Sequence, residues 1–156
     1  MPRTLRCLTA CVLSLLALPA LAVEPGDRVT PFTLLDQFEQ PYTLDAHASV
    51  ILVARSMATA KVVDAALQQR EKGYLEARHV VYVADIERMP AVAKLFAIPS
   101  MRSASYRIML DQSGSVATRL EGDRDTVQWV KLKDGKVDSV QHFSEAAPLR
   151  EALEAL

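Results

Sequence analysis

Cysteine is scarce in this chain of 156 residues, and its placement decides which chemistry the chain can carry out. The two cysteines, Cys7 and Cys11, both lie close to the N-terminus, and no thiol follows them. The chain after residue 11 can therefore form no disulfide and exchange no electrons through thiols. Hydroxyl and thioether side chains cannot take over this role, because they do not ionise near neutral pH as a thiol does.

Motifs for cofactors and metals are also missing. The sequence has no G-x-G-x-x-G, no Walker A loop and no G-x-S-x-G, so nothing indicates a nicotinamide, flavin, nucleotide or serine-hydrolase site. The histidines are far apart and lack metal-ligand spacing. Methionines favour copper, but here they show no ligand spacing and are typical core residues. We therefore expect no cofactor and no metal; the residues weighed for a metal are His47, His79, His142, Met57, Met89, Met101 and Met109.

The charge of the chain is small and evenly spread. The formal net charge is −1, and acidic and basic residues alternate without a basic block or stripe. Proteins that bind nucleic acid or anionic membranes usually carry such a block. The sequence therefore favours neither as a partner.

The N-terminus has the features of a cleavable signal peptide. Arg3 and Arg6 precede an apolar run, and Ala20-Leu21-Ala22 fits a small-x-small cleavage site. The run is shorter than the ~20 residues that a membrane span needs. We expect a signal peptide over residues 1–22, followed by one domain over residues 23–156 with no membrane span after cleavage. A retained anchor and a lipid on Cys11 are alternatives. Cleavage would remove both cysteines, and a cysteine-free exported chain suits the bacterial periplasm.

The hydrophobic pattern predicts an α/β domain. A continuous apolar run at 48–56 and a second at 79–86 indicate strands buried on both faces. A helix should follow the first run, with Ser56 or Thr59 as its cap. Two short strands are expected before residue 45, a helix at 88–98, hairpins turning at Ser113-Gly114 and Asp134-Gly135, and a final helix from Ser144 with Leu149, Leu153 and Leu156 facing inward. Trp129 is expected in the core. Helices on both faces of a mixed sheet are the simplest packing.

Three stretches resemble the thioredoxin-like superfamily. "GDRVTPFTLLDQFEQPYTLD" is similar to the opening of peroxiredoxins and TlpA-type proteins, "VVYVADIERMPAVAKLFAI" to a strand–helix passage of thioredoxins, and "VQWVKLKDGKVDSVQHFSEAAPLREAL" to their last hairpin and helix. The closest likeness is to small periplasmic YtfJ-type proteins, which lack the redox cysteine pair. The resemblance implies a three-layer sandwich, with a mixed central sheet, helices on both faces and an extra β-hairpin.

The same resemblance places the functional joint of the fold at residues 55–61. Thioredoxins carry two cysteines there, whereas this chain reads Arg55-Ser56-Met57-Ala58-Thr59-Ala60-Lys61. Ala104 or Ser105 stands where the family has a proline facing the thiols. A thiol oxidoreductase or peroxidase is therefore not expected.

The joint still offers groups that could hold an anion. A helix N-terminus carries unpaired N–H groups and partial positive charge, to which Arg55 and Lys61 add formal charge. An ordinary capped helix with two solvated cations would look the same in sequence. The candidate ligand-binding residues are Arg55, Ser56, Met57, Thr59, Lys61, Asp85 and Ser105.

Two classes of function remain open at this stage. The first is an exported, non-enzymatic binding or adaptor module for a protein, a peptide or a small anionic ligand. The second is an enzyme with a non-thiol site at the same joint, or an accessory protein of a periplasmic redox system. Asp85 or a histidine beside the joint would favour an enzyme, and an apolar groove there would favour binding.

Overall fold

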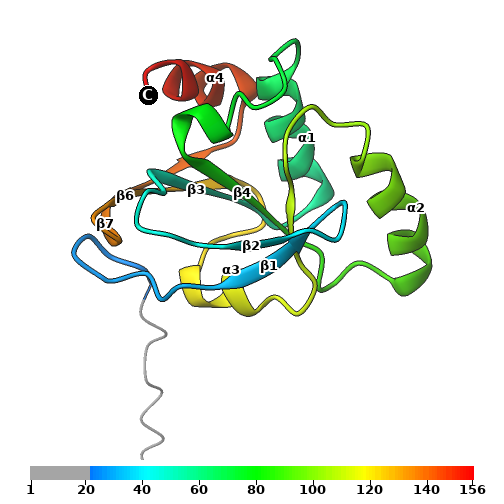
Figure 1. Ribbon diagram of the computed structural model, residues 1–156, viewed down its shortest axis with the longest axis horizontal. Coiled ribbons are helices and arrows are strands. Elements are labelled where there is room, and N and C mark those ends of the chain that lie inside the picture. The colour runs from blue at the N-terminus through cyan, green and yellow to red at the C-terminus, as the bar shows by residue number, and fades with distance from the viewer. Residues whose placement is uncertain (1–21) are drawn as a thin grey trace, which may run out of the picture.

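The computed structural model describes residues 22–156 of the chain, which form one mixed sheet with helices on both faces (Figure 1). Cys7, Cys11 and most of the expected signal peptide lie outside the described residues. The sheet has seven strands in the order β2-β1-β5-β4-β3-β6-β7. The strands are β1 (Thr33–Asp36), β2 (Pro41–Thr43), β3 (Val50–Ala54), β4 (Val80–Asp85), β5 (Met109–Asp111), β6 (Val127–Lys133) and β7 (Lys136–Phe143).

The four helices are short. They are α1 (Met57–Leu67), α2 (Ala91–Met101), α3 (Ser115–Leu120) and α4 (Ala146–Glu154), and a 3₁₀ turn spans Glu76–Arg78. Within residues 22–156, none of them combines the length and the apolar character needed to cross a membrane.

The strands predicted from the two apolar runs lie at the centre of the sheet. β3 is parallel to β4 and antiparallel to β6, with Leu52 opposite Tyr82 on one side and Trp129 on the other. β5 extends the parallel part beyond β4. Every residue of β3 is buried because helices cover both faces, as a continuous apolar run predicts.

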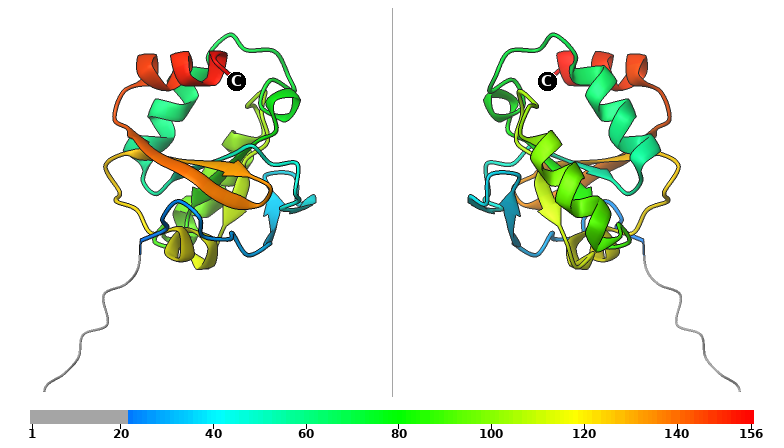
Figure 2. Two further views of the ribbon diagram at one scale, coloured as in Figure 1. Left: turned by 90° about the vertical axis from the view of Figure 1, so that its left-hand side faces the viewer. Right: turned by 90° about the vertical axis from the view of Figure 1, so that its right-hand side faces the viewer.

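Side chains from alternate positions of these strands fill two separate core layers. Leu52 and Ala54 point toward α1 and α4, whereas Ile51 and Val53 point toward α3 and the N-terminal segment. Figures 1 and 2 show α1 and α4 above the sheet and α3 below it. The expected three-layer α/β architecture is therefore confirmed.

One of the two predicted hairpins is wrong. The segment after Ser113-Gly114 is helix α3 and not a returning strand. The Asp111 carboxylate accepts hydrogen bonds from the backbone N–H groups of Ser115, Val116 and Ala117, which fixes the first turn of a helix. Burial of Val116, Ala117 and Leu120 follows helical spacing, which was available in the sequence.

The last part of the chain agrees with expectation except at its ends. β6 and β7 form the hairpin predicted at Asp134-Gly135. Trp129 is buried as predicted, with its ring edge-on to Phe143 at a centroid distance of 5.8 Å. The N-cap of α4 is Glu145 rather than Ser144, and no side chain caps it. Leu156 was expected to face inward, but 43% of the residue is exposed.

Candidate functional site

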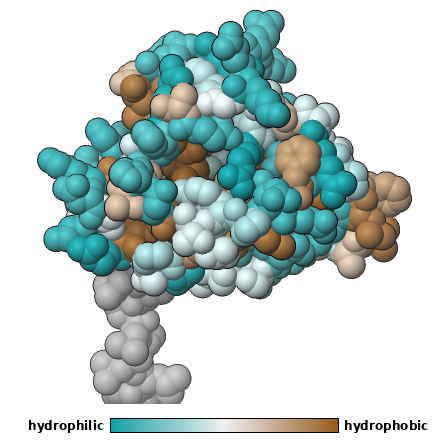
Figure 3. All heavy atoms as spheres, in the orientation of Figure 1, coloured by the Kyte–Doolittle hydropathy of each residue, from teal (hydrophilic) through white to brown (hydrophobic). Residues whose placement is uncertain are grey.

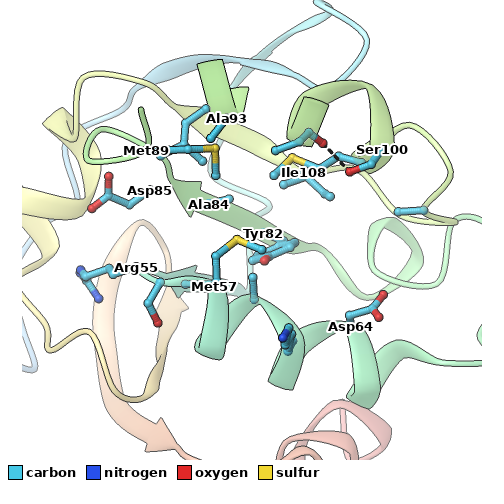
Figure 4. A pocket seen from close by; sticks show the side chains of 18 of the residues that line it. Arg55, Met57, Asp64, Tyr82, Ala84, Asp85, Met89, Ala93, Ser100 and Ile108 are labelled. Carbon is cyan, nitrogen blue, oxygen red and sulfur yellow. Dashed lines mark hydrogen bonds between the residues drawn. The ribbon is translucent and has the colours of Figure 1, made fainter. Parts of the chain in front are cut away.

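A groove of about 780 Å³ lies between α1 and α2, beside residues 55–61, where β3 is connected to α1. One wall consists of α1 residues such as Met57 and Lys61, and the other of α2 residues such as Ala93. Tyr82 and Ala84 of β4 form its floor (Figure 4). The candidate joint therefore opens onto a cavity large enough for a small molecule or a side chain of a peptide.

The groove exists because small residues line positions where larger ones would have filled it. Ala60 of α1, Ala84 of β4 and Ala93 and Ala97 of α2 all contribute to its surface. Ala93 and Ala97 are four residues apart and so share one face of α2. None of the residues of α2 is fully buried, which shows that this helix covers the sheet without closing against it.

Arg55 lies at the joint, but its guanidinium is not available to a ligand. Only 4% of the residue is exposed. Its Nη2 donates to Gln128 Oε1 at 2.7 Å and to the Ala117 carbonyl at 3.0 Å, on the α3 side of the sheet. Figure 4 shows the guanidinium directed away from Met57 and Tyr82. Burial lowers the pKa of Arg55, and the negative charge of Asp85 opposes this effect. The Arg55 side chain holds the sheet to α3.

Strand alternation explains the direction of Arg55. It follows Ala54 and has the same parity as Ile51 and Val53, whose side chains belong to the α3 layer. This parity was visible in the sequence.

The hydroxyl groups of Ser56 and Thr59 also form hydrogen bonds to other groups of the protein. Ser56 is the N-cap of α1; its Oγ accepts from the Thr59 backbone N–H at 3.2 Å and donates to the Arg124 carbonyl at 2.7 Å. The Thr59 Oγ1 accepts from the backbone N–H groups of Arg55 and Ser56 at 3.1 and 3.0 Å. Thr59 is 1% exposed. This is a capping box, with threonine in the position usually held by glutamate.

The groove is lined by five of the candidates, which are Arg55, Ser56, Met57, Lys61 and Asp85. Of these, Met57, Lys61 and Asp85 have side chains that are not engaged with another element of the fold in the ways described for Arg55 and Ser56. Met57 is 60% exposed, and its flexible thioether lies at the edge of the groove. Asp85 lies at the end of β4, where its carboxylate accepts a hydrogen bond from the Glu87 backbone N–H at 3.0 Å. Asp85 therefore acts at least in part as a turn cap.

Ser105 is not part of the groove. Its Oγ donates to the Arg70 carbonyl at 3.2 Å, and its neighbours Ala104 and Tyr106 line the cavity instead. The loop that carries them is held by the buried Gln37 amide. This amide donates to the Tyr106 carbonyl at 2.8 Å and accepts from the Ile108 N–H at 2.9 Å.

Two tyrosines in the groove were missed in the sequence. Tyr82 is buried in the floor, and its ring lies 6.0 Å from that of Tyr106. The Tyr106 hydroxyl donates to the Asp64 carboxylate at 3.0 Å. Burial raises the pKa of both phenols, and the charge of Asp64 adds to the effect at Tyr106. Both phenols are therefore neutral, and the Tyr106 hydroxyl acts as a hydrogen-bond donor. Because side chains alternate along a strand, Tyr82 points to the same face of the sheet as Ala84, and the sequence could have indicated this. No sequence pattern indicated the position of Tyr106.

The groove carries an excess of positive charge. Besides Arg55, whose guanidinium points to the α3 side, Lys61, Arg88 and Arg124 line the groove together with only two acids, Asp64 and Asp85. Both carboxylates already accept hydrogen bonds within the protein.

The titratable groups that an enzyme or a metal would need do not gather here. The chain's three histidines all lie within residues 22–156, and none of them lines the groove. The described residues include no cluster of three His, Asp or Glu side chains suited to a metal ion. The groove is lined by three methionines that are far apart in the sequence, which are Met57, Met89 and Met101.

Comparison with known proteins identifies the fold. No family model and no curated protein matches the sequence. Among solved structures, the peroxidoxin BcpB from Mycobacterium tuberculosis is 20% identical, with a TM-score of 0.55 over 85% of this chain and 95% of that one. A peroxiredoxin-like protein from Aquifex aeolicus is 15% identical, with a TM-score of 0.52 over 86% and 88% of the two chains. The thioredoxin domain of a thiol-disulfide oxidoreductase from Bacteroides vulgatus is 14% identical, with a TM-score of 0.53 over 86% and 98%. The chain has the fold of the thioredoxin-like superfamily.

Proposed function

We propose that this chain is an exported, non-enzymatic binding protein whose groove between α1 and α2 holds a small amphipathic anion. The observation that carries this proposal is the groove itself, which is apolar, open and positively charged at the joint where thioredoxins keep their thiols. A peptide with an apolar side chain and a nearby carboxylate has the same chemistry and is included.

The apolar part of the ligand would lie on the floor and the small-residue walls. Tyr82 and the alanines of α2 offer surface without a competing charge. Met57 is flexible and largely exposed, so it can fold over a bound group of irregular shape. Burial of apolar ligand surface supplies roughly 25 cal/mol for each Å² removed from water.

The anionic part would lie at the N-terminal end of α1. The first N–H groups of a helix have no acceptor within the helix, and the partial charge of the helix dipole is positive there. Lys61 is one turn further on and lines the same groove. Since the Arg55 guanidinium is engaged with Gln128, we assign the cationic role to Lys61 and not to Arg55.

The alternative of a non-thiol enzyme has less support. The Asp85 carboxylate caps the turn before Glu87, and no histidine lines the groove. A proton-transfer step would need a titratable group facing a bound substrate and a group for it to activate. A role as an accessory to a redox system also lacks a cofactor ligand in the sequence.

A fluorescent probe with the required chemistry tests the proposal. We suggest 1-anilinonaphthalene-8-sulfonate, an aromatic sulfonate, titrated into a chain that starts at residue 22. We expect Ala97→Phe, which fills the groove, to lower the affinity at least tenfold, and Ala147→Phe, on the exposed side of α4, to leave it unchanged. Equal loss in both variants, or none in either, would contradict the proposal.

The charge of the ligand can be tested separately. Lys61→Gln should weaken binding of the sulfonate several-fold but leave the uncharged N-phenyl-1-naphthylamine unaffected. Lys133→Gln, an exposed lysine at the end of β6, is the matched control. In parallel, insulin reduction and peroxide consumption by the same protein should equal the blank, because it contains no thiol.

A further inference from the structure

The outer face of α2 is apolar and has no partner within the described chain. Val92, Leu95 and Phe96 are 69, 72 and 74% exposed, the highest values among the large apolar residues of residues 22–156. They stand at positions i, i+3 and i+4, so they share one side of the helix. Figure 3 shows exposed apolar atoms gathered at the right-hand side of the molecule, where α2 lies in Figure 1.

This face is distinct from the ligand groove. Ala93 and Ala97, on the inner side of the same helix, line the groove, whereas Val92, Leu95 and Phe96 do not. An 11-residue helix is marginally stable by itself and depends on packing. Exposure of three large apolar side chains on a helix with no fully buried residue indicates that another surface covers it.

The charges around this face indicate which surface that is. Residues 88–110 contain four basic residues and no acid, although the whole chain has a formal net charge of −1. One of the four, Arg107, forms an ion pair with Asp36 of β1 and does not add to the charge of this face. Arg88 is exposed three residues before the start of α2. Arg102 is exposed at the C-terminal end of α2, where its Nε donates to the Gln37 carbonyl at 2.8 Å. The acidic residue that directly precedes this segment in the sequence is Glu87, and its side chain lies next to Gly114 at the start of α3. The apolar stripe is thus flanked by cations at both ends.

We propose that α2 docks this protein on an anionic lipid surface, with Val92, Leu95 and Phe96 inserted among the lipids and Arg88 and Arg102 at the headgroups. Short helices that combine an apolar face with flanking cations bind in this way, and the binding is weak and reversible. Two copies of the chain meeting through α2 would bring the same cations together, which opposes a symmetric dimer. The even charge of the sequence as a whole gives no reason to expect a membrane partner. The absence of acidic residues from residues 88–110 does give such a reason.

Vesicle co-sedimentation tests the proposal. The strands and helices described for residues 22–156 pack into two core clusters of their own, so we expect a chain that starts at residue 22 to keep this fold while lacking the apolar N-terminal run. We expect it to bind vesicles with 30% phosphatidylglycerol in phosphatidylcholine several-fold better than pure phosphatidylcholine vesicles. High salt should reduce the difference.

A pair of variants distinguishes the α2 face from other exposed apolar residues. Leu95→Ser/Phe96→Ser should lower the bound fraction at least threefold, whereas Leu156→Ser, which is also exposed but lies at the C-terminus, should not. Phe96→Trp should keep binding and gain a blue-shifted emission on the vesicles. All three positions are exposed, so we expect the fold to be retained, and circular dichroism checks this.

Three results would overturn the proposal. They are the absence of binding to either vesicle, equal binding by wild type and the double variant, and a concentration-dependent dimer that the double variant abolishes. The last would assign the face to a second copy of this chain. None of them bears on the groove, because Val92, Leu95 and Phe96 are not among the residues that line it.

Discussion

Replacing Thr59 by valine tests whether the joint is built for structure or left free for a ligand. Valine keeps the shape of threonine but removes the hydroxyl, which accepts from the Arg55 and Ser56 N–H groups and donates to the Ser56 carbonyl at 3.0 Å. Each such bond contributes about 1 kcal/mol net, and a buried N–H left without an acceptor costs about 1–3 kcal/mol. Because Thr59 is 1% exposed, water cannot easily replace the lost oxygen. We expect the free energy of unfolding to fall by about 3 kcal/mol.

Urea denaturation measures this change, and thermal unfolding should show a decrease of about 10 °C in the midpoint, from roughly 3–4 °C per kcal/mol at this chain length. Thr118→Val is the matched control, because Thr118 is exposed on α3 and the same substitution there should change stability by less than about 0.5 kcal/mol. Equal stability of the two variants would refute the view that the Thr59 hydroxyl holds the joint together.

Three further predictions follow from the buried polar groups. Gln37→Leu should lower the free energy of unfolding by about 2–4 kcal/mol in urea denaturation, because the Gln37 amide holds the loop of Tyr106 through buried hydrogen bonds; an unchanged midpoint would contradict this. Burial raises the pKa of Asp36, but hydrogen bonds from two backbone N–H groups and from Arg107 outweigh it and hold the pKa below its ordinary value. The ionised Asp36 carboxylate therefore contributes its full stabilisation above the unfolded-state pKa of about 3.9, and this stabilisation is lost as the pH falls through the lower folded-state pKa. The difference in the free energy of unfolding between wild type and Asp36→Asn should accordingly become smaller from pH 5 to pH 2. A difference that does not change with pH would show that ionised Asp36 contributes nothing to stability. Absorbance at 295 nm should show fewer phenolates at pH 11 than four free tyrosines would give, because burial raises the pKa of Tyr82 and Tyr106, and the missing phenolates should form on unfolding; a full complement in the folded protein would contradict this.

The seven residues predicted as ligand-binding illustrate how far sequence patterns reach. Met57 and Lys61 were placed at the joint and Asp85 at the end of the second buried strand, and all three lie at one groove. Arg55, Ser56 and Thr59 were placed at the joint correctly, but their polar groups bind other parts of the protein. The sequence shows which groups are near one another along the chain, whereas the direction of each side chain depends on strand parity and on what packs beyond it.

The groove could not be predicted from any one segment. Its surface comes from alanines in α1, β4 and α2, which are each ordinary in their own element. Only the packing of α2 against the sheet turns them into a cavity. The mistaken hairpin at Ser113-Gly114 has a different and local cause, because the Asp111 carboxylate binds three backbone N–H groups just after it and starts α3 where a turn was expected.

The sequence by itself determined that no thiol follows Cys11, that two strands are buried on both faces, and that a capped helix follows the first of them. These are local facts, fixed by composition, apolar runs and the hydrogen bonds of neighbouring residues. The tertiary structure decided that the Arg55 guanidinium binds Gln128 and the Ala117 carbonyl, that α1 and α2 enclose a groove, and that α2 exposes an apolar face. Each of these depends on how far apart two elements lie across the sheet, and that distance is set by side chains many residues away.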